Sequence, residues 1–351
     1  MHLFIPHASA LGQAAEAAIR QIDLPHLAEL LSALELAPDA APPAPSQPST
    51  TASHASDEGA GNKPAGDHDE LEYRLSPPHE AALARLAGWP GRDGNWPLAA
   101  WWARRDGLEL SDLASPDAGL GLITPVHWRI GQEIDLTDPQ QLELREDESR
   151  ALLDLVRPSF DDAGWQIHWA APLRWYASSP ALRTLACASI DRVINRNVDL
   201  WLPRAADARL LRRLQVEVQM TWHDHPINEA REGRRLPVVN SFWLSGCGVA
   251  QAAPLPADLV LDERLAAPLL SGDWLEWCQA WQALDVGPIT DLLARARAGQ
   301  AIELTLCGER LANTWRTPQQ ARSLWQRTQH KLGGWFGASS APDVRALLGR
   351  L

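Results

Sequence analysis

Histidine and aspartate, residue types that hold metals and move protons, come together in one tight group, His223-Asp224-His225. Two ligands at positions i and i+2 can share a metal ion if the backbone is extended, because alternate side chains of a strand point the same way. On a helix they diverge, and a histidine at a helix C-terminus interacts favourably with the helix dipole instead. The group follows an apolar helical pattern and precedes Pro226, so we prefer the helix-capping interpretation and keep a metal site as the alternative.

Arginines gather in HPINEAREGRR, residues 225–235, just before the strand pattern VVNSFWL and the small residues SGCG at 245–248. Pro226 is expected to end the preceding helix, and Asn228 to cap a short helix that begins at Glu229. Arginines beside a glycine-containing turn suit a phosphate or carboxylate group, because a guanidinium donates paired hydrogen bonds. A solvated connector with partly neutralised charge, followed by a plain tight turn, explains the same residues.

The elements that must position these side chains begin with a small N-terminal segment, residues 1–37. A short apolar strand is expected over 2–6, and apolar residues at helical spacing predict helices over 10–22 and 24–36. Residues 38–69 are rich in Pro, Ala, Ser and Gly and lack periodicity, which predicts a disordered linker.

Residues 70–253 predict an α+β region that contains the arginine cluster. The run LGLITPVHWRIGQEIDLT alternates as a hairpin does, and the helix ESRALLDLVRPSF is expected to end at Pro158. The strongest helical pattern covers about 205–222. Further expected elements are helices in LSPPHEAALARLAGW and WPLAAWWARRDG and strands in GWQIHWAA and LRWYAS.

Residues 254–351 alternate between strand and helix patterns. DLVL and AIELTLCG are strand-like, and GDWLEWCQAWQAL, ITDLLARARAG and TPQQARSLWQRTQHKLGGW are helical. This alternation favours an α/β fold in which a layered sheet is flanked by helices. Most tryptophans fall at core positions, among them Trp89, Trp222, Trp277 and Trp281, so they are predicted as core residues.

Composition excludes several classes of function. A chain of 351 residues is too long for one compact core of common size, so two lobes or a large insertion are expected. The net charge of −12 argues against nucleic acid or anionic membranes as general partners. The sequence contains no apolar run long enough to span a bilayer, and its N-terminus does not resemble a secretory signal, so a cytoplasmic protein is expected.

The segment HPINEAREGRRLPVVNSFWLSGCG resembles the archaeal-type, cofactor-independent phosphoglycerate mutases of the alkaline-phosphatase superfamily, which carry His-Pro-x-Asn, then Arg, then Asn-x-x-Trp-Leu-x-Gly-x-Gly. The matching residues are His225, Pro226, Asn228, Arg231, Asn240, Trp243, Leu244, Gly246 and Gly248. Over its whole length the chain is similar to a bacterial group often named phosphoglycerate mutase or RpfE-type regulatory protein, in MHLFIPHASAL, LSPPHEAALARLAGW, ASIDRVINRNVDLWLP and VNSFWLSGCG.

The resemblance implies a reduced alkaline-phosphatase-like core with an inserted α+β middle region, in which residues 254–351 complete the core. It also implies a ligand pocket made by His225, Asn228, Arg231, Asn240, Trp243, Gly246 and Gly248, with Trp243 as a wall.

The chain departs from the mutase pattern where metals would bind. The family's first strand ends in Asp-Gly, with the Asp as a metal ligand, whereas here the strand LFIP is followed by His7-Ala8-Ser9. Near the C-terminus, where the family shows an Asp and a His, this chain offers only Glu309. Two-metal phosphoryl transfer needs several carboxylates and imidazoles, so no cofactor is expected. An active enzyme would have to hold a divalent metal with substitute ligands, for which His7, His223, His225 and Glu309 are the candidates.

The sequence therefore predicts a reduced relative that acts by binding, as a cytosolic regulatory factor for a phosphorylated small molecule or a protein partner. A cofactor-independent phosphoglycerate mutase, or a related metal-dependent phosphotransferase, is the second hypothesis. A protein-interaction scaffold whose tryptophans face a partner is the third. Nucleic acid and membranes are not expected as partners.

Overall fold

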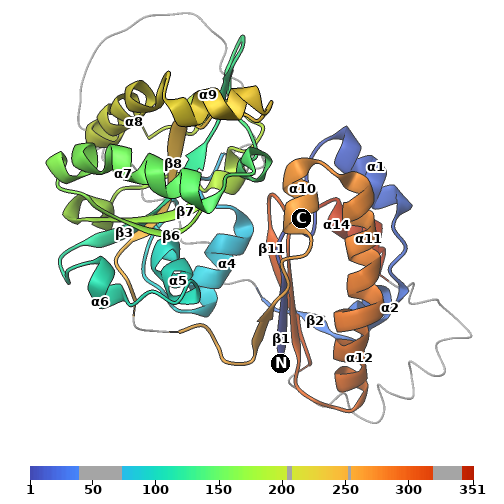
Figure 1. The fold of residues 1–351 in the computed structure, drawn as a ribbon. Coiled ribbons are helices and arrows are strands. Elements are labelled where there is room, and N and C mark those ends of the chain that lie inside the picture. Colours follow the sequence, from blue (N-terminus) through green and yellow to red (C-terminus); the bar gives the residue numbers. More distant parts are fainter. Residues whose placement is uncertain (39–72, 204–207, 252–253, 319–341) are drawn as a thin grey trace, which may run out of the picture. The chain divides into compact units, whose positions relative to one another are not determined.

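The computed structural model describes residues 1–38, 73–203, 208–251, 254–318 and 342–351, which form two compact units (Figure 1). Unit 1 comprises residues 1–73, 260–265 and 274–351, and unit 2 comprises residues 74–259 and 266–273. The predicted linker beyond residue 38 and most of the helix predicted from Thr317 lie outside the described residues. Among the helices of the described ranges, none is both long and apolar enough to cross a membrane.

Unit 1 is built on a five-stranded mixed sheet in the order β2-β11-β10-β1-β9. β1 (His2–Ile5) pairs in parallel with β10 (Glu303–Cys307), so the first strand of the chain completes a sheet with one of the last. β10 pairs antiparallel with β11 (Ala312–Arg316), and β11 pairs antiparallel with β2 (Glu35–Leu36). β9 (Leu259–Leu261) lies at the other edge.

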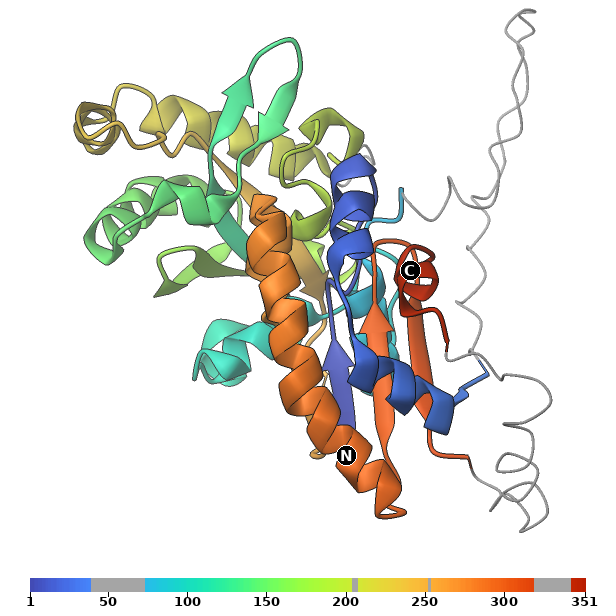
Figure 2. The same cartoon turned by 90° about the vertical axis from the view of Figure 1, so that its right-hand side faces the viewer.

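Helices cover this sheet. In both views α1, α2, α11 and α12 lie against the same face of it (Figures 1 and 2). α11 passes into α12 through a π-helical turn at Asp285–Ile289. Trp277 and Trp281 of α11 are fully buried, as the sequence predicts. The helices are α1 (Gln13–Gln21), α2 (Pro25–Ala33), α11 (Trp274–Leu284), α12 (Thr290–Arg297) and α14 (Val344–Leu348).

Unit 2 contains a four-stranded antiparallel sheet in the order β6-β7-β3-β8. Its strands are β6 (Gln166–Ala171), β7 (Arg174–Ser179), β3 (Gly119–Val126) and β8 (Ser241–Gly248). The predicted hairpin is confirmed by β4 (Trp128–Ile130) and β5 (Ile134–Leu136), which pair antiparallel.

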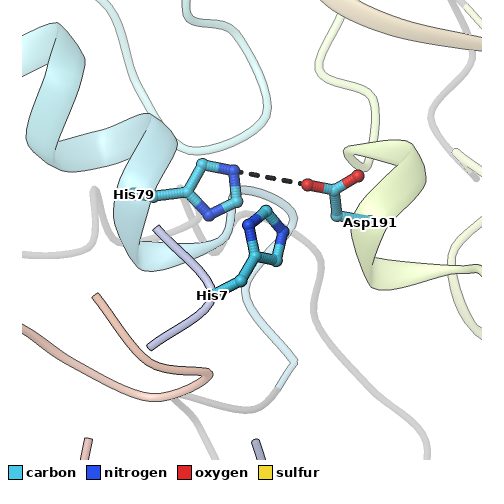
Figure 3. A group of neighbouring side chains, drawn as sticks. All are labelled: His7, His79 and Asp191. Atoms are coloured by element: carbon cyan, nitrogen blue, oxygen red, sulfur yellow. Dashed lines mark ion pairs between the residues drawn. The ribbon is translucent and has the colours of Figure 1, made fainter. Parts of the chain in front are cut away.

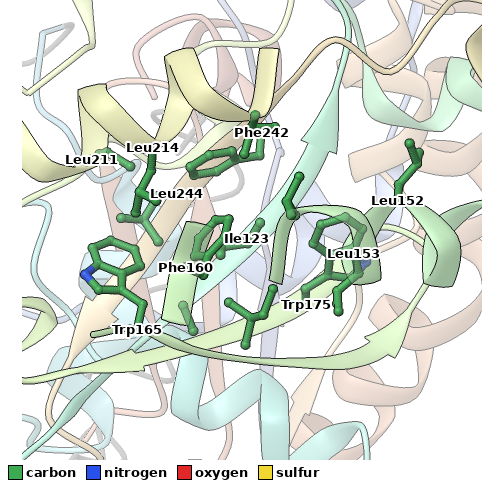
Figure 4. Packing of buried hydrophobic residues seen from close by; sticks show 14 of the residues in the cluster. Ile123, Leu152, Leu153, Phe160, Trp165, Trp175, Leu211, Leu214, Phe242 and Leu244 are labelled. Carbon is green, nitrogen blue, oxygen red and sulfur yellow. The ribbon is translucent and has the colours of Figure 1, made fainter. Parts of the chain in front are cut away.

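Two helices, α7 (Glu146–Asp162) and α8 (Arg209–Trp222), pack on one face of this sheet over the main core of unit 2 (Figure 4). On the other face, α5 (Leu98–Arg105) packs on Leu120 and Tyr176. The remaining helices are α4 (Pro78–Leu86), α6 (Leu110–Leu113), α9 (Pro226–Gly233) and α10 (Ala266–Ser271). The predicted fold class, layered sheets with flanking α-helices, is confirmed.

Three local predictions are wrong. α7 continues through Pro158 to Asp162, because Phe160, beyond the proline, is fully buried in the core and holds the last turn in place. α9 begins at Pro226 rather than at Glu229: a proline suits the first helical position, and the cap is His225 instead of Asn228. SGCG is not a turn after the strand, because β8 runs on to Gly248 with a register irregularity against β3.

Candidate functional site

Arg231, which was expected to bind an anion, is fully buried and uses its donors inside unit 2. Its Nη1 donates to Glu148 Oε2 at 2.6 Å, its Nε donates to the carbonyl of Pro237 at 2.9 Å, and its Nη2 donates to the carbonyl of Leu142. Arg234 also donates to Glu148. The two guanidinium groups hold the pKa of Glu148 below its usual range, against the effect of its burial. Arg231 therefore ties α9 to the start of α7.

The two asparagines of the motif are likewise engaged by the backbone. Asn228 donates to the carbonyls of Trp222 and Val239, both at 2.9 Å, and accepts from the N–H of Val239. Asn240 accepts from the N–H of Trp128 at 2.7 Å and donates to its carbonyl at 2.9 Å. These bonds fasten the chain just before β8, to the start of α9 and to Trp128 of β4.

The other motif residues also make structural contacts. His225 Nδ1 accepts from the N–H of Ile227 as the cap of α9. Trp243 is a core residue, 2% exposed, and its indole donates to the carbonyl of Ala188 at 2.9 Å, so the structure buries the predicted pocket wall. Gly246 has a φ of 62° and packs so closely on α5 that a Cβ would lie 2.9 Å from the nitrogen of Ala99. Gly248 packs against Pro97 in the same way.

The four candidate metal ligands are not brought together within either unit. His7 and Glu309 belong to unit 1, where Glu309 accepts from the N–H of Leu11 at 2.9 Å. His223 and His225 belong to unit 2, and the side chain of His223 is 80% exposed beside Asp224. Their use as ligands stays a prediction.

Unit 2 does bring together a second group, here called the Glu80 cluster: His79, Glu80, Ser189 and Asp191. His79 and Glu80 lie in the first turn of α4, which two prolines start and where an acidic side chain suits the helix dipole. The other two residues lie in and before the 3-10 turn η3 (Ile190–Arg192). The Ser189 hydroxyl donates to Glu80 Oε1 at 2.6 Å, and His79 Nε2 lies 3.3 Å from Asp191 Oδ2 (Figure 3).

A backbone frame holds the two halves of this cluster together. The carboxylate of Asp93 accepts from the N–H groups of Leu75 and Ser76 at 2.9 and 2.8 Å, just before α4. The N–H of Ser189 in turn donates to the carbonyl of Leu75 at 2.9 Å. The start of α4 and the turn η3 are therefore joined by main-chain as well as side-chain bonds.

Within this cluster, Glu80 has an unusually high pKa for a carboxyl group. The pKa of Glu80 is raised from 4.5 to about 8, chiefly by burial and then by the negative charge of Asp191, although the Ser189 hydrogen bond and the charge of Arg192 lower it. Asp191 also contributes, after burial, to raising the pKa of Asp138. At neutral pH, Glu80 therefore carries a proton beside an imidazole–carboxylate pair.

This arrangement can hold or release a proton near neutrality, which is the pKa range of general acids and bases. Its fit to a divalent metal is incomplete. His79 and Asp191 supply two donor types that metals accept, but catalytic zinc sites use three protein ligands, and Glu80 favours its proton. A divalent metal held here would need at least one ligand besides His79 and Asp191.

The residues near His79 in the sequence do not indicate that it pairs with a carboxylate. Its partner Asp191 comes 112 positions later, and the Glu80–Ser189 pair is separated by 109 positions. The one available signal was the acidic first turn of a proline-started helix in LSPPHEAALARL.

Comparison with known proteins gives only distant similarity. No protein-family model matches the chain, and no curated protein sequence matches it. The structure is similar to that of the PH0037 protein from Pyrococcus horikoshii, with 11% identity and a TM-score of 0.44 over 92% of this chain and 88% of that one. It is also similar to the cofactor-independent phosphoglycerate mutase from Thermoplasma acidophilum, with 12% identity and a TM-score of 0.34 over 100% and 99% of the chains. At these values neither similarity assigns an activity.

Proposed function

We propose that this chain acts by binding, as a cytosolic regulatory factor of the phosphoglycerate-mutase-like kind, rather than by turning over a phosphorylated substrate. The observation that supports this is the engagement of Arg231. Its guanidinium is completely buried and bonded to Glu148 and to two backbone carbonyls.

A phosphorylated substrate at this position would have to displace Glu148 from Arg231. Breaking a buried ion pair costs about 3–5 kcal/mol, because the remaining charge is left without its partner. The motif is therefore better suited to holding α9, β8 and α7 together than to exchanging ligands. The arginines it leaves at the surface are Arg234, whose side chain is 38% exposed, and Arg235, which is exposed as well. These two are the groups that a phosphorylated ligand can reach.

Incubation of the full chain with 3-phosphoglycerate, followed by phosphorus NMR, tests this proposal. We expect no 2-phosphoglycerate, and we expect phosphorylated metabolites to raise the melting temperature without being consumed, since a bound ligand stabilises the folded state by mass action. The Arg235→Ala variant should show a smaller shift than wild type, and Arg20→Ala, on the exposed face of α1, is the control. Turnover of 3-phosphoglycerate would contradict the proposal that the chain acts by binding. If the melting temperature shifts equally in all three proteins, or in none of them, the proposal of a phosphorylated ligand at these arginines is wrong.

A metal-dependent phosphotransferase is the second candidate, and the specific observation in its favour is the Glu80 cluster. A carboxyl group that is protonated at neutral pH can protonate a leaving group, and the His79–Asp191 pair offers ligand atoms. This candidate predicts turnover that chelation abolishes and that His79→Ala reduces. Turnover that persists with a chelator would exclude it.

The exposure of the tryptophans bears on the protein-interaction hypothesis. Of the tryptophans in the described residues, ten are buried, and a partner could contact the other five, which are partly buried: Trp101, Trp102, Trp128, Trp169 and Trp274.

A further inference from the structure

Unit 2 contains a cleft of about 720 Å³ that is lined by neither the motif nor the Glu80 cluster. Small-molecule sites in proteins have volumes of about 300–1,000 Å³, so the cleft has room for one. One side comes from residues 107–113, which lead into and form α6, and the other side comes from α7 and β6. All of its lining residues belong to unit 2, so the site is complete within that unit.

Two arginines on the α7 side are held in fixed positions. The guanidinium of Arg150 lies over the indole of Trp169, 3.5 Å from the ring centroid, and that indole is fixed by a 3.0 Å hydrogen bond to Ser149. Arg157 donates through Nη1 to the carbonyl of Ile167 on β6 at 2.8 Å. Arginines held in this way lose little freedom on binding, and a guanidinium pairs well with a carboxylate. Both arginines also make exposed intrahelical ion pairs, Arg150 with Glu146 at 2.9 Å and Arg157 with Asp154 at 3.4 Å. Exposed pairs of this kind are weak, so the carboxylate of a ligand can replace them.

The α6 side of the cleft carries negative charge, because Glu109 and Asp112 are exposed carboxylates. Asp161 of α7 adds a third acid to the lining. Two arginines against three acids leave the lining with a net charge of −1 when His168 is neutral. A dianionic phosphate gains little from such a surface, whereas a ligand with both signs of charge can pair with each side.

His168 of β6 also lines this cleft. Its Nε2 is buried and has no hydrogen-bond partner among the residues that the structure describes. Burial, and secondly the charge of Arg157, lower its pKa, which keeps the ring neutral. A buried polar atom without a partner costs about 1–3 kcal/mol, and the neutral ring needs a donor or an acceptor depending on its tautomer.

We propose that this cleft binds a small zwitterion with an ammonium and a carboxylate group, that is, a free α-amino acid or a short peptide. The carboxylate pairs with Arg150 and Arg157, and the ammonium group pairs with Glu109 and Asp112. This goes beyond the function proposed above and does not depend on it, because the cleft shares no residue with the arginines assigned there.

Isothermal titration of the full chain with each standard L-amino acid and with the dipeptide L-Ala-L-Leu tests the proposal. We expect at least one of these probes to bind, and its N-acetylated and methyl-ester forms each to bind at least about tenfold more weakly, because each lacks one charge. Arg157→Ala and Asp112→Asn should each weaken binding by a similar factor. Arg213→Ala is the matched control, because Arg213 also makes an exposed intrahelical ion pair, with Glu217 on α8.

Circular dichroism of the three variants establishes that they are folded, so that a loss of binding reports on the cleft. The proposal is overturned if no amino acid or dipeptide binds, or if a bound probe keeps its affinity in both cleft variants. It is also overturned if 3-phosphoglycerate, but none of the zwitterions, binds in an Arg157-dependent manner. That last result would leave the binding function proposed above intact.

Discussion

Replacing Glu80 with glutamine should make unit 2 more stable at neutral and mildly alkaline pH. The glutamine keeps the shape of the side chain and an acceptor for the Ser189 hydroxyl, which lies 2.6 Å from Oε1 of Glu80, but it cannot ionise. In wild type, the pKa of Glu80 rises from 4.5 in the unfolded chain to about 8 in the fold, because burial and Asp191 disfavour its charge. The folded state therefore keeps a proton that the unfolded state releases.

The sign of this stability change follows from proton linkage. Between pH 4.5 and about 8 the folded chain binds more protons at Glu80 than the unfolded chain, so its contribution to stability falls as pH rises and then levels off. The slope is about 1.4 kcal/mol per pH unit. At pH 7 the upper limit of the loss is roughly 3 kcal/mol, and partial exposure of the side chain makes it smaller. E80Q removes this loss.

Urea denaturation of wild type and E80Q, followed by fluorescence at both ends of this pH interval, measures the effect. We expect the two proteins to be about equally stable near pH 4.5 and E80Q to be more stable near pH 8. The control is Glu232→Gln, an exposed residue at the end of α9, which should follow wild type at both pH values. Parallel stability profiles for wild type and E80Q would refute the assignment of a proton to buried Glu80.

Two substitutions test how single residues hold elements together, one in each unit. Gly246→Ala should destabilise unit 2 by about 2 kcal/mol or more, through its φ of 62° and the 2.9 Å approach to Ala99. Gly88→Ala, with a φ of 64° but open space, should lower the melting temperature less, and equal losses would contradict the packing argument. In unit 1, Asp285 accepts from the N–H and ring of His26 and from the N–H of Leu27, so Asp285→Ala should cost about 1–2 kcal/mol and speed amide exchange in α2. Unchanged exchange there would show that Asp285 does not hold the start of this helix.

The parts of the fold that sequence predicts well are those with a periodic apolar pattern. The apolar pattern predicts a helix over about 205–222, and α8 is found at Arg209–Trp222 with Leu211, Leu214, Val218 and Trp222 buried. β1 and β10 were similarly evident from short apolar runs. Periodicity reports which face of an element is buried, and that depends on neighbouring residues alone. The errors occurred where tertiary packing decides, as at Pro158.

The candidate site was much less predictable than the fold. Arginine at position 231 is compatible with an anion site or with a buried ion pair, and the choice depends on Glu148, which lies 83 positions earlier. Likewise nothing near Glu80 in the sequence indicates that Ser189 and Asp191 will lie beside it. Burial and distant charges set the chemistry of these groups, and both exist only after folding.

The parallel pairing of β1 with β10 has a consequence for synthesis of the chain. Leu3 pairs with Leu304, so the sheet of unit 1 cannot close until the ribosome has made about three hundred residues. The main segment of unit 2, residues 74–259, emerges before that point. Unit 2 can therefore fold during translation while the first strand waits for its partner, and the apolar run from Leu3 to Ile5 is the segment that a chaperone would have to shield meanwhile.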